Sequence, residues 1–261
     1  MSLAWLRGLG LHATRFVATL GQLTAFAMLI VRASFSRPIR IRRFVDEMYA
    51  VGVVSVPIVC VSAATIGMVL ALQGYSTLSR FGATSNLGAV VGLTLIKELG
   101  PVLTALLVAG RAGSAIAAEI GSMVATQQLD GLRLMSLDPI DLEVAPKAAA
   151  MVASMPLLSA LFIVVGLAGG FLYSSIALVL DTGAFVSSLE NAVVFRTDVA
   201  GSLVKSLVFG VLVSLIATYR GYTAAPHAAG VSAATTSTVV QASVAILIFD
   251  YFITALWEVG W

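Results

Sequence analysis

Charged side chains are scarce in this sequence. Asp, Glu, Lys and Arg make up 11% of its 261 residues, whereas hydrophobic residues make up 59% and the mean hydropathy is +1.01. Soluble domains carry about 25% charged residues, because a folded protein needs a polar exterior towards water. The composition therefore excludes an ordinary soluble protein and indicates an all-α protein that crosses a membrane several times.

Cysteine, histidine and nucleotide-binding motifs are also sparse. The single Cys60 cannot form a disulfide within one chain, and His12 and His227 are too few and too isolated for a metal site. The sequence has no GxxxxGK[ST] motif, which a P-loop needs to hold nucleotide phosphates. A net charge of +2 is too small to indicate a nucleic-acid partner. We therefore expect no catalytic residue, no metal and no cofactor bound by this chain.

Long stretches without charge predict the membrane spans. A helix needs about 20 apolar residues to cross the hydrocarbon core. Charge-free stretches predict spans near residues 48–73, 148–174 and 235–257. Two more apolar segments, 86–118 and 199–219, contain charges that must face protein or water instead of lipid tails. The sequence thus predicts five transmembrane helices.

The segment before the first span has a different pattern. Its apolar stretch, residues 16–31, is rather short to span, and Arg7, His12 and Arg15 lie loosely on one side of a helix. We expect an N-terminal amphipathic helix in the membrane interface, with a sixth span as the alternative. The whole chain, 1–261, is expected to form one domain, with this helix and a basic segment in 1–43 and the spans in 44–261.

Basic residues near the span ends predict the orientation. Five arginines lie between residues 32 and 43, whereas the C-terminus carries Glu258 and no basic residue. Lys and Arg are enriched in cytoplasmic segments of membrane proteins. We therefore expect a cytoplasmic N-terminus, and an odd number of spans places the C-terminus on the opposite side of the membrane.

The connection between the second and third spans has a helical composition. Residues 111–139 are rich in the helix formers Ala, Leu, Met and Gln, and Asp138-Pro139 supplies a stop. We expect a short cytoplasmic helix over residues 119–135, which is either an ordinary connection or an element that inserts into a cytoplasmic partner. The candidate contact residues are Glu119, Met123, Gln128, Asp130, Leu132, Arg133 and Met135.

Charges within the predicted spans form a second group of candidates. Lys97, Glu98, Lys205 and Asp250 are costly in a membrane and typically mark a cavity or a pair. Two interpretations remain open, a polar lining beside a lipid cavity and salt bridges between helices. Pro101 lacks an N–H, so it should loosen the second span close to Lys97.

One long run of residues resembles the signature of the MlaE/YrbE permease family. It is LIKELGPVLTALLVAGRAGSAIAAEIGSMVATQQLDGLRLMSLDP, residues 95–139. The similarity continues through LQGY, NAVVFRTD, GYTAAPHAAGVSAATTSTVV and FDYFITAL, so it covers most of the chain from about residue 40. The FRTD and LIFD details resemble the phospholipid-trafficking MlaE branch more than the YrbE branch.

The resemblance implies a homodimeric permease subunit of an ABC transporter, with an interfacial helix and five spans in each protomer. The partners it implies are cytoplasmic ATPase subunits that use ATP, a periplasmic hexamer of MCE-domain proteins and a small STAS-domain protein. The cargo it implies is phospholipid, moved between the bacterial inner membrane and the outer membrane. In such an inner membrane the C-terminus would be periplasmic. The helix over residues 119–135 would then be the coupling helix that contacts the ATPase.

The resemblance also implies a lipid pocket at the end of the first span, shared by two protomers. Leu70, Leu72 and Leu78 would face the lipid tails, with Gln73 and Tyr75 beside them; plain packing between helices is the alternative.

Three other functions remain open. They are an ion-coupled secondary transporter that uses the intramembrane charges, a scaffold that does not transport, and a permease for a sterol or hydrocarbon.

Overall fold

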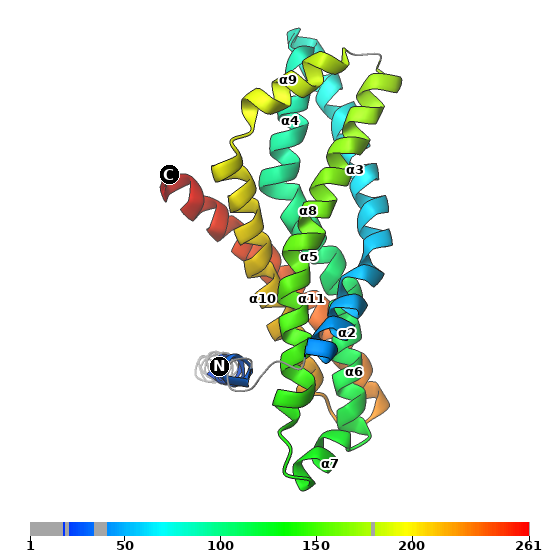
Figure 1. Ribbon diagram of the computed structural model, residues 1–261, viewed down its shortest axis with the longest axis vertical. Helices are drawn as coiled ribbons and strands as arrows, with labels where there is room; N and C mark the ends of the chain where they lie inside the picture. Colours follow the sequence, from blue (N-terminus) through cyan, green and yellow to red (C-terminus); the bar gives the residue numbers. More distant parts are fainter. Residues whose placement is uncertain (1–17, 19–20, 34–40, 179–180, 261) are drawn as a thin grey trace, which may run out of the picture.

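All regular structure in the described part of the chain is helical. The computed structural model describes residues 18, 21–33, 41–178 and 181–260. Most of the long helices run along the longest axis of the molecule, with α7 (Gln128–Leu134) and α9 (Thr182–Ala192) at opposite ends (Figure 1). The predicted all-α architecture is confirmed.

Five helical stretches are long and apolar enough to cross a membrane. They are Ile41–Phe81, Thr84–Ala125, Ile140–Ile176, Phe195–Tyr222 and Ala228–Trp257. Each contains one of the predicted segments, which confirms five spans among the described residues. The stretches are longer than the predicted runs because polar residues continue each helix beyond its apolar part.

The first span consists of two helices that meet at a short irregular turn. The amphipathic helix α2 (Ile41–Val51) is followed by a 3₁₀ turn (Val53–Ser55) and by the apolar helix α3 (Val56–Leu78). Pro57 lies in the first turn of α3 and has no N–H, so it cannot donate to the carbonyl of Val53 as an uninterrupted α-helix requires. The proline explains why the helix changes form at this point.

The second span combines three α-helical segments with two π-helical turns. In chain order these are α4 (Leu87–Thr94), the π segment Leu95–Leu99, α5 (Gly100–Val108), the π segment Ala109–Gly113 and α6 (Ser114–Ala125). Short π-helical segments are rare and occur frequently at functional sites. Both contain charged residues, Lys97 and Glu98 in the first and Arg111 in the second.

Close helix contacts are made by glycine. The third span, α8 (Ala145–Ile176), packs along α3, and a Cβ on Gly67 would collide with the carbonyl of Gly166. Gly170 lies against the backbone of Gly67 in the same contact. Gly88 on α4 lies against the Phe185 carbonyl of α9. Glycine allows such an approach where lipid supplies no hydrophobic force between helices.

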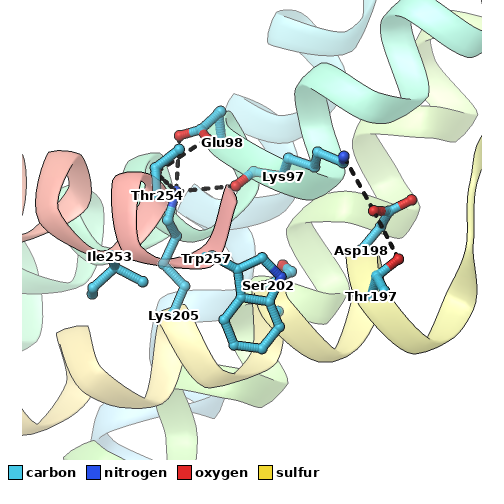
Figure 2. A pocket seen from close by; sticks show the side chains of 10 residues that line it. Lys97, Glu98, Thr197, Asp198, Ser202, Lys205, Ile253, Thr254 and Trp257 are labelled. Atoms are coloured by element: carbon cyan, nitrogen blue, oxygen red, sulfur yellow. Dashed lines mark hydrogen bonds and ion pairs between the residues drawn. The ribbon is translucent and has the colours of Figure 1, made fainter. Parts of the chain in front are cut away.

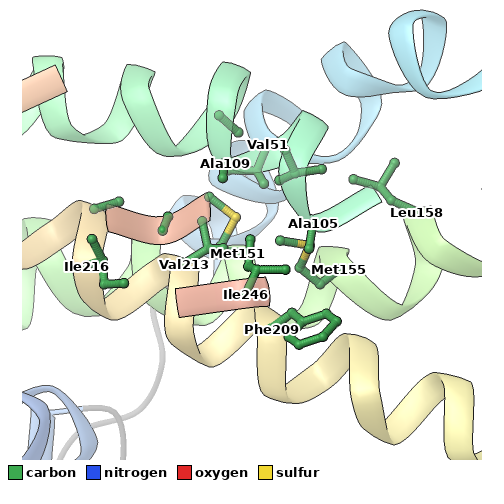
Figure 3. Packing of buried hydrophobic residues seen from close by; sticks show 14 of the residues in the cluster. Val51, Ala105, Ala109, Met151, Met155, Leu158, Phe209, Val213, Ile216 and Ile246 are labelled. Carbon is green, nitrogen blue, oxygen red and sulfur yellow. The ribbon is translucent and has the colours of Figure 1, made fainter. Parts of the chain in front are cut away.

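The fourth and fifth spans complete the bundle. A π turn (Phe195–Val199) leads into α10 (Ala200–Tyr222), and α11 (Ala228–Gly260) follows. The side chains of Met151, Met155, Phe209, Val213 and Ile246, on the third, fourth and fifth spans, pack together as part of the apolar core (Figure 3).

The N-terminal helix crosses the direction of the spans. Its described part covers Gly21–Ala33, which by itself is too short for a span, and is seen nearly end-on beside α10 in Figure 1. Phe26 is buried against the rings of Tyr219 and Tyr222, and the Tyr219 hydroxyl donates a 3.0 Å hydrogen bond to Gln22 Oε1. The described part of this segment therefore matches the predicted interfacial helix. The predicted basic face of Arg7, His12 and Arg15 lies outside the described residues.

Candidate functional site

A buried lysine on α10 is the centre of a cluster of intramembrane charges. Nζ of Lys205, whose side chain is 5% exposed, lies 2.8 Å from Oε2 of Glu98 and 2.7 Å from Oδ1 of Asp250. It also donates hydrogen bonds to the hydroxyl of Thr254 (2.8 Å) and to the carbonyl of Lys97 (3.1 Å). The second, fourth and fifth spans thus meet at one ammonium group (Figure 2).

The Lys97 carbonyl can accept this bond because of a proline. Pro101 has no N–H to donate to the carbonyl four residues earlier. Gly100 donates to the carbonyl of Leu95, five residues earlier, which closes the π turn. The predicted loosening of the helix at Pro101 is confirmed, and it exposes a backbone acceptor to Lys205.

A second ion pair lies beside the first. Nζ of Lys97 is 3.2 Å from Oδ1 of Asp198, and the two side chains are 50% and 7% exposed. Asp198 is held in place by the backbone N–H of Val194, which donates a 2.8 Å hydrogen bond to its Oδ2. Figure 2 shows the side chain of Lys97 extended towards Asp198, away from Lys205.

A small cavity separates the two ion pairs. Its volume is about 60 Å³, and it is lined by Lys97, Glu98, Thr197, Asp198, Gly201, Ser202, Lys205, Ile253, Thr254 and Trp257. Sites for drug-sized ligands typically measure roughly 300–1,000 Å³. The cavity of this single protomer therefore has room for water but not for a phospholipid headgroup.

The structure separates the predicted lipid-contacting residues into two sets. Lys97, Glu98, Lys205 and Asp250 belong to one connected cluster, in which the salt bridges left open by the sequence are present. The five residues of α3 are not among those that line the cavity. Leu70, Tyr75 and Leu78 pack against the core, whereas Leu72 and Gln73 are exposed on the outer surface.

The expected single helix over residues 119–135 is wrong. Glu119 and Met123 lie on α6, which continues the second span, and only the seven residues of α7 form a separate helix. The chain turns at Gln127, whose φ of 58° is left-handed and cannot continue an α-helix. Residue composition favours helix on both sides of this turn and therefore did not reveal it.

The short helix α7 presents a mixed surface at one end of the molecule. Leu129 and, in part, Leu132 are packed against the core, whereas Met135 is 63% exposed just after the helix. Arg133 pairs with Asp130 (2.9 Å). A hydrogen bond and the charge interaction with Tyr222, together with the nearby Asp130, raise the pKa of Arg133 above its ordinary value, so this side chain stays cationic. Gln128 is exposed at the start of the helix.

A second buried lysine joins three helices near the same end. Lys147 on α8 is 1% exposed, and its Nζ lies 2.6 Å from Oε1 of Glu47 on α2 and 2.7 Å from Oε1 of Glu119 on α6. Arg43 adds an ion pair from α2 to Glu143 (2.7 Å). The amphipathic helix α2 is thus fixed by charges to the third span, and through Lys147 to the second.

Asp198, Glu47 and Lys147 were not predicted as site residues. Asp198 could have been predicted from the sequence. A lysine inside a span, such as Lys97, needs a negatively charged partner, and Asp198 lies at the start of the apolar run of the fourth span. Glu47 and Lys147 lie at opposite ends of about 100 residues of chain. Their contact depends on tertiary packing that no local pattern reports.

The sequence matches known proteins along most of its length. Residues 44–256 match the family model described as Permease MlaE. The chain is 47% identical to the intermembrane phospholipid transport system permease protein MlaE of Haemophilus influenzae over 212 residues, 81% of each chain. It is 38% identical to a probable ABC transporter permease protein of Rickettsia typhi over 95% of each chain. It is 32% identical to the chloroplastic protein trigalactosyldiacylglycerol 1 of Arabidopsis thaliana, over 84% of this chain and 62% of that protein.

The match to the family model spans the π turn that carries Lys97 and Glu98, the turn that precedes α7, and the positions of Lys205 and Asp250. A match of this length and identity extends over the membrane-spanning fold as a whole. The chain belongs to the MlaE permease family.

Proposed function

We propose that this chain is the membrane-spanning permease subunit of an ATP-driven transporter that moves phospholipids between the inner and outer membranes of a bacterial envelope. Such transport would maintain the lipid asymmetry of the outer membrane. The observation that carries the proposal is the 47% identity to the phospholipid transport permease of Haemophilus influenzae. The chain would lie in the inner membrane with its N-terminus cytoplasmic and its C-terminus periplasmic.

The intramembrane charge cluster is proposed to contact the lipid headgroup or to gate its passage. Its two lysines differ in exposure and in the number of their partners. Lys205 is buried and pairs with two carboxylates, whereas Lys97 is half-exposed and pairs with one. A phosphate competes most easily for Lys97, because less of that contact is buried. Movement of Lys97 away from Asp198 would also enlarge the small cavity, whose apolar side is formed by Ile253 and Trp257.

The proposed functional unit is a homodimer. The surface of α6 and α11 carries a shallow groove of about 540 Å³ lined by Gly110, Ser114, Ala115, Ala118, Thr235, Thr236, Val239 and Val240. Small residues on a membrane-facing surface allow a second helix to approach closely. In the dimer, Leu70, Leu72, Gln73, Tyr75 and Leu78 would line a shared lipid pocket, which gives the exposed Leu72 and Gln73 a binding role.

The ATPase is proposed to bind at α7. A chain without a P-loop can use ATP only through another subunit, and α7 follows the cytoplasmic end of the second span in the predicted orientation. Leu134 and Met135 are apolar and 88% and 63% exposed, so they are suited to insert into a cleft on that subunit. Gln128, Asp130 and Arg133 would surround them, while Glu119, Met123 and Leu132 would support the helix from within this chain.

Two further partners follow from the family resemblance alone. They are a periplasmic hexamer of MCE-domain proteins and a small cytoplasmic STAS-domain protein. The periplasmic partner would bind near the end of the molecule marked by α9, which lies opposite α7 (Figure 1).

Reconstitution of the complex tests the proposal. The permease and an ABC ATPase from the same organism would be placed in liposomes, and transfer of fluorescent phospholipid to acceptor liposomes would be followed with and without ATP. We expect ATP-dependent transfer that a Lys205→Met variant loses, with Arg42→Gln, an exposed charge on α2, as the control. Transfer that follows a proton gradient without ATP would establish the secondary transporter instead. ATP-dependent transfer of a sterol or hydrocarbon but not of phospholipid would correct the cargo.

A further inference from the structure

An apolar groove lies between the N-terminal helix and two spans. It has a volume of about 420 Å³ and is lined by Ala27, Ile30, Val31, Ala148, Ala149, Val152, Ala153, Pro156, Leu207, Val211, Ser214 and Leu215. None of these residues belongs to the charge cluster or to the surface of α6 and α11. The groove exists because α8 presents three alanines here, whose side chains are too short to fill the space next to α10.

The groove has the dimensions of a site for one lipid tail. Its α8 wall extends from Ala148 to Pro156, and its α10 wall from Leu207 to Leu215. Eight residues of α-helix correspond to about 12 Å, close to the ~15 Å half-thickness of a hydrocarbon core of ~30 Å. Its volume is within the range of sites that hold small organic ligands, roughly 300–1,000 Å³.

The chemistry of the groove admits an apolar occupant. The lining side chains are aliphatic except for Ser214, and the hydroxyl of Ser214 already donates a 3.0 Å hydrogen bond to the carbonyl of Val211 on its own helix. A polar ligand would therefore lose its bonds to water without replacement. Val211 is 44% exposed, so the groove opens towards the lipid-facing surface.

The N-terminal helix lies at the end of the groove that contains Leu215. Phe26 packs on Tyr219 and Tyr222, at the end of α10 that the groove approaches through Leu215. Arg32 is exposed and follows the lining residue Val31. A guanidinium at the membrane surface favours an anionic phosphate group, so the charge of this helix complements a phospholipid whose tail enters below it.

We propose that this groove binds one acyl chain of a glycerophospholipid from the leaflet that contains the N-terminal helix, with its phosphate beside Arg32. The bound lipid fastens the short N-terminal helix to α8 and α10. This site is distinct from the transport pathway, and it does not depend on which cargo the complex moves.

Site-specific photo-crosslinking in the full-length protein tests the proposal. A small diazirine amino acid would be placed at Val211, in the groove, or at Val164, which is 64% exposed on the same span as the alanines but outside the groove. After purification in detergent, which removes loosely bound lipid, adducts would be identified by mass spectrometry. We expect a phospholipid adduct at Val211 at least several-fold more abundant than at Val164.

Variants that fill the groove give the second measurement. Ala153→Phe should reduce the Val211 adduct several-fold, and the smaller change Ala149→Leu gives the same test if the first variant does not fold. Arg32→Gln should lower the share of anionic lipid in the adduct. Equal labelling at Val211 and Val164, an adduct unaffected by both filling variants, or attachment of Val211 to residues 1–20 or to another protein would each overturn the proposal. Absence of ATP-dependent transport would leave these ratios unchanged, so the two proposals fail separately.

Discussion

Replacing Lys147 with methionine measures how much the buried charge near α7 contributes to stability. Methionine has a similar length and no charge, so the variant removes the ammonium group while largely keeping the packing. The substitution leaves the carboxylates of Glu47 and Glu119 without their cation. These side chains are 22% and 51% exposed.

The expected loss follows from these exposures. Removal of one partner from a fully buried pair costs about 3–5 kcal/mol, whereas exposed pairs contribute about 0–1 kcal/mol. Because water reaches half of Glu119 but little of Glu47, we expect Lys147→Met to cost about 3 kcal/mol, at the lower limit of the buried range. Glu47→Gln keeps an oxygen that accepts from Lys147 but removes the negative charge of the partly buried pair, so it should cost about 1–2 kcal/mol. Glu119→Gln should cost less than about 1 kcal/mol.

Thermal unfolding of the detergent-purified protein measures the order of these effects. With about 2–4 °C of midpoint shift per kcal/mol for chains near this length, Lys147→Met should unfold about 6–12 °C below the wild type. Arg43→Gln is the control, since Arg43 is 46% exposed in its pair with Glu143, and it should shift the midpoint little.

A triple variant separates the loss of attraction from the cost of stranded charge. Lys147→Met combined with Glu47→Gln and Glu119→Gln leaves no unpaired ion, and replacing a whole buried ionic group is often neutral. We therefore expect the triple variant to recover most of the lost stability. If it unfolds at the same temperature as Lys147→Met alone, or if Glu119→Gln is as damaging as Lys147→Met, this electrostatic reasoning is wrong.

Three further changes test other parts of the molecule. Gly67→Ala should lower the unfolding midpoint markedly, because its Cβ would collide with the Gly166 carbonyl, whereas a Cβ on Gly21 meets nothing within 4 Å, so Gly21→Ala should not lower it. Arg133→Glu should keep the protein folded but reduce co-purification of the ATPase, because the reversed charge weakens the contact with that subunit and the hydrogen bond to Tyr222 is lost. If the ATPase binds this variant as it binds the wild type, α7 is not part of the interface. Pro101→Ala restores a backbone N–H that can donate to the Lys97 carbonyl and removes the destabilising effect of a proline within a helix, ~3 kcal/mol. The unfolding midpoint should therefore rise while phospholipid transfer slows, and a lower midpoint would contradict this reasoning.

The membrane-spanning part of the fold could be predicted because its cause is local. Each span requires a long apolar run, and the runs are visible in the sequence whether or not they carry a charge such as Lys205. The short N-terminal helix was predicted for the same reason, since its apolar stretch is too brief to cross the bilayer. The break at Gln127 was missed because a single left-handed residue leaves the helical composition on both sides unchanged.

The charged residues of the site could be predicted from the sequence, but the ion pairs that they form could not. Lys97, Glu98, Lys205 and Asp250 are conspicuous because charge is rare within apolar runs. Which carboxylate meets which lysine depends on helix rotation and on the π turn at Leu95–Leu99, which changes the direction of the following residues. The sequence left headgroup contact and salt bridging as alternatives, and the structure contains the salt bridges in a single protomer.

Both clusters of buried charge involve the second span, and this gives the span a mechanical role in the proposed transporter. Glu98 lies in its first π turn and Glu119 lies on α6, close to the turn into α7. A force applied to α7 would therefore reach Lys147 through Glu119 before it reached Lys205 through Glu98. In the π turns between these points, each backbone hydrogen bond joins residues five apart, whereas in an α-helix it joins residues four apart. A switch between the two patterns would rotate the Glu98 segment relative to α6. Because Lys205 has several partners, it can lose one of them during such a rotation and still be paired. A buried lysine with a single partner would become an unpaired ion, and the free-energy cost of that state would oppose the rotation.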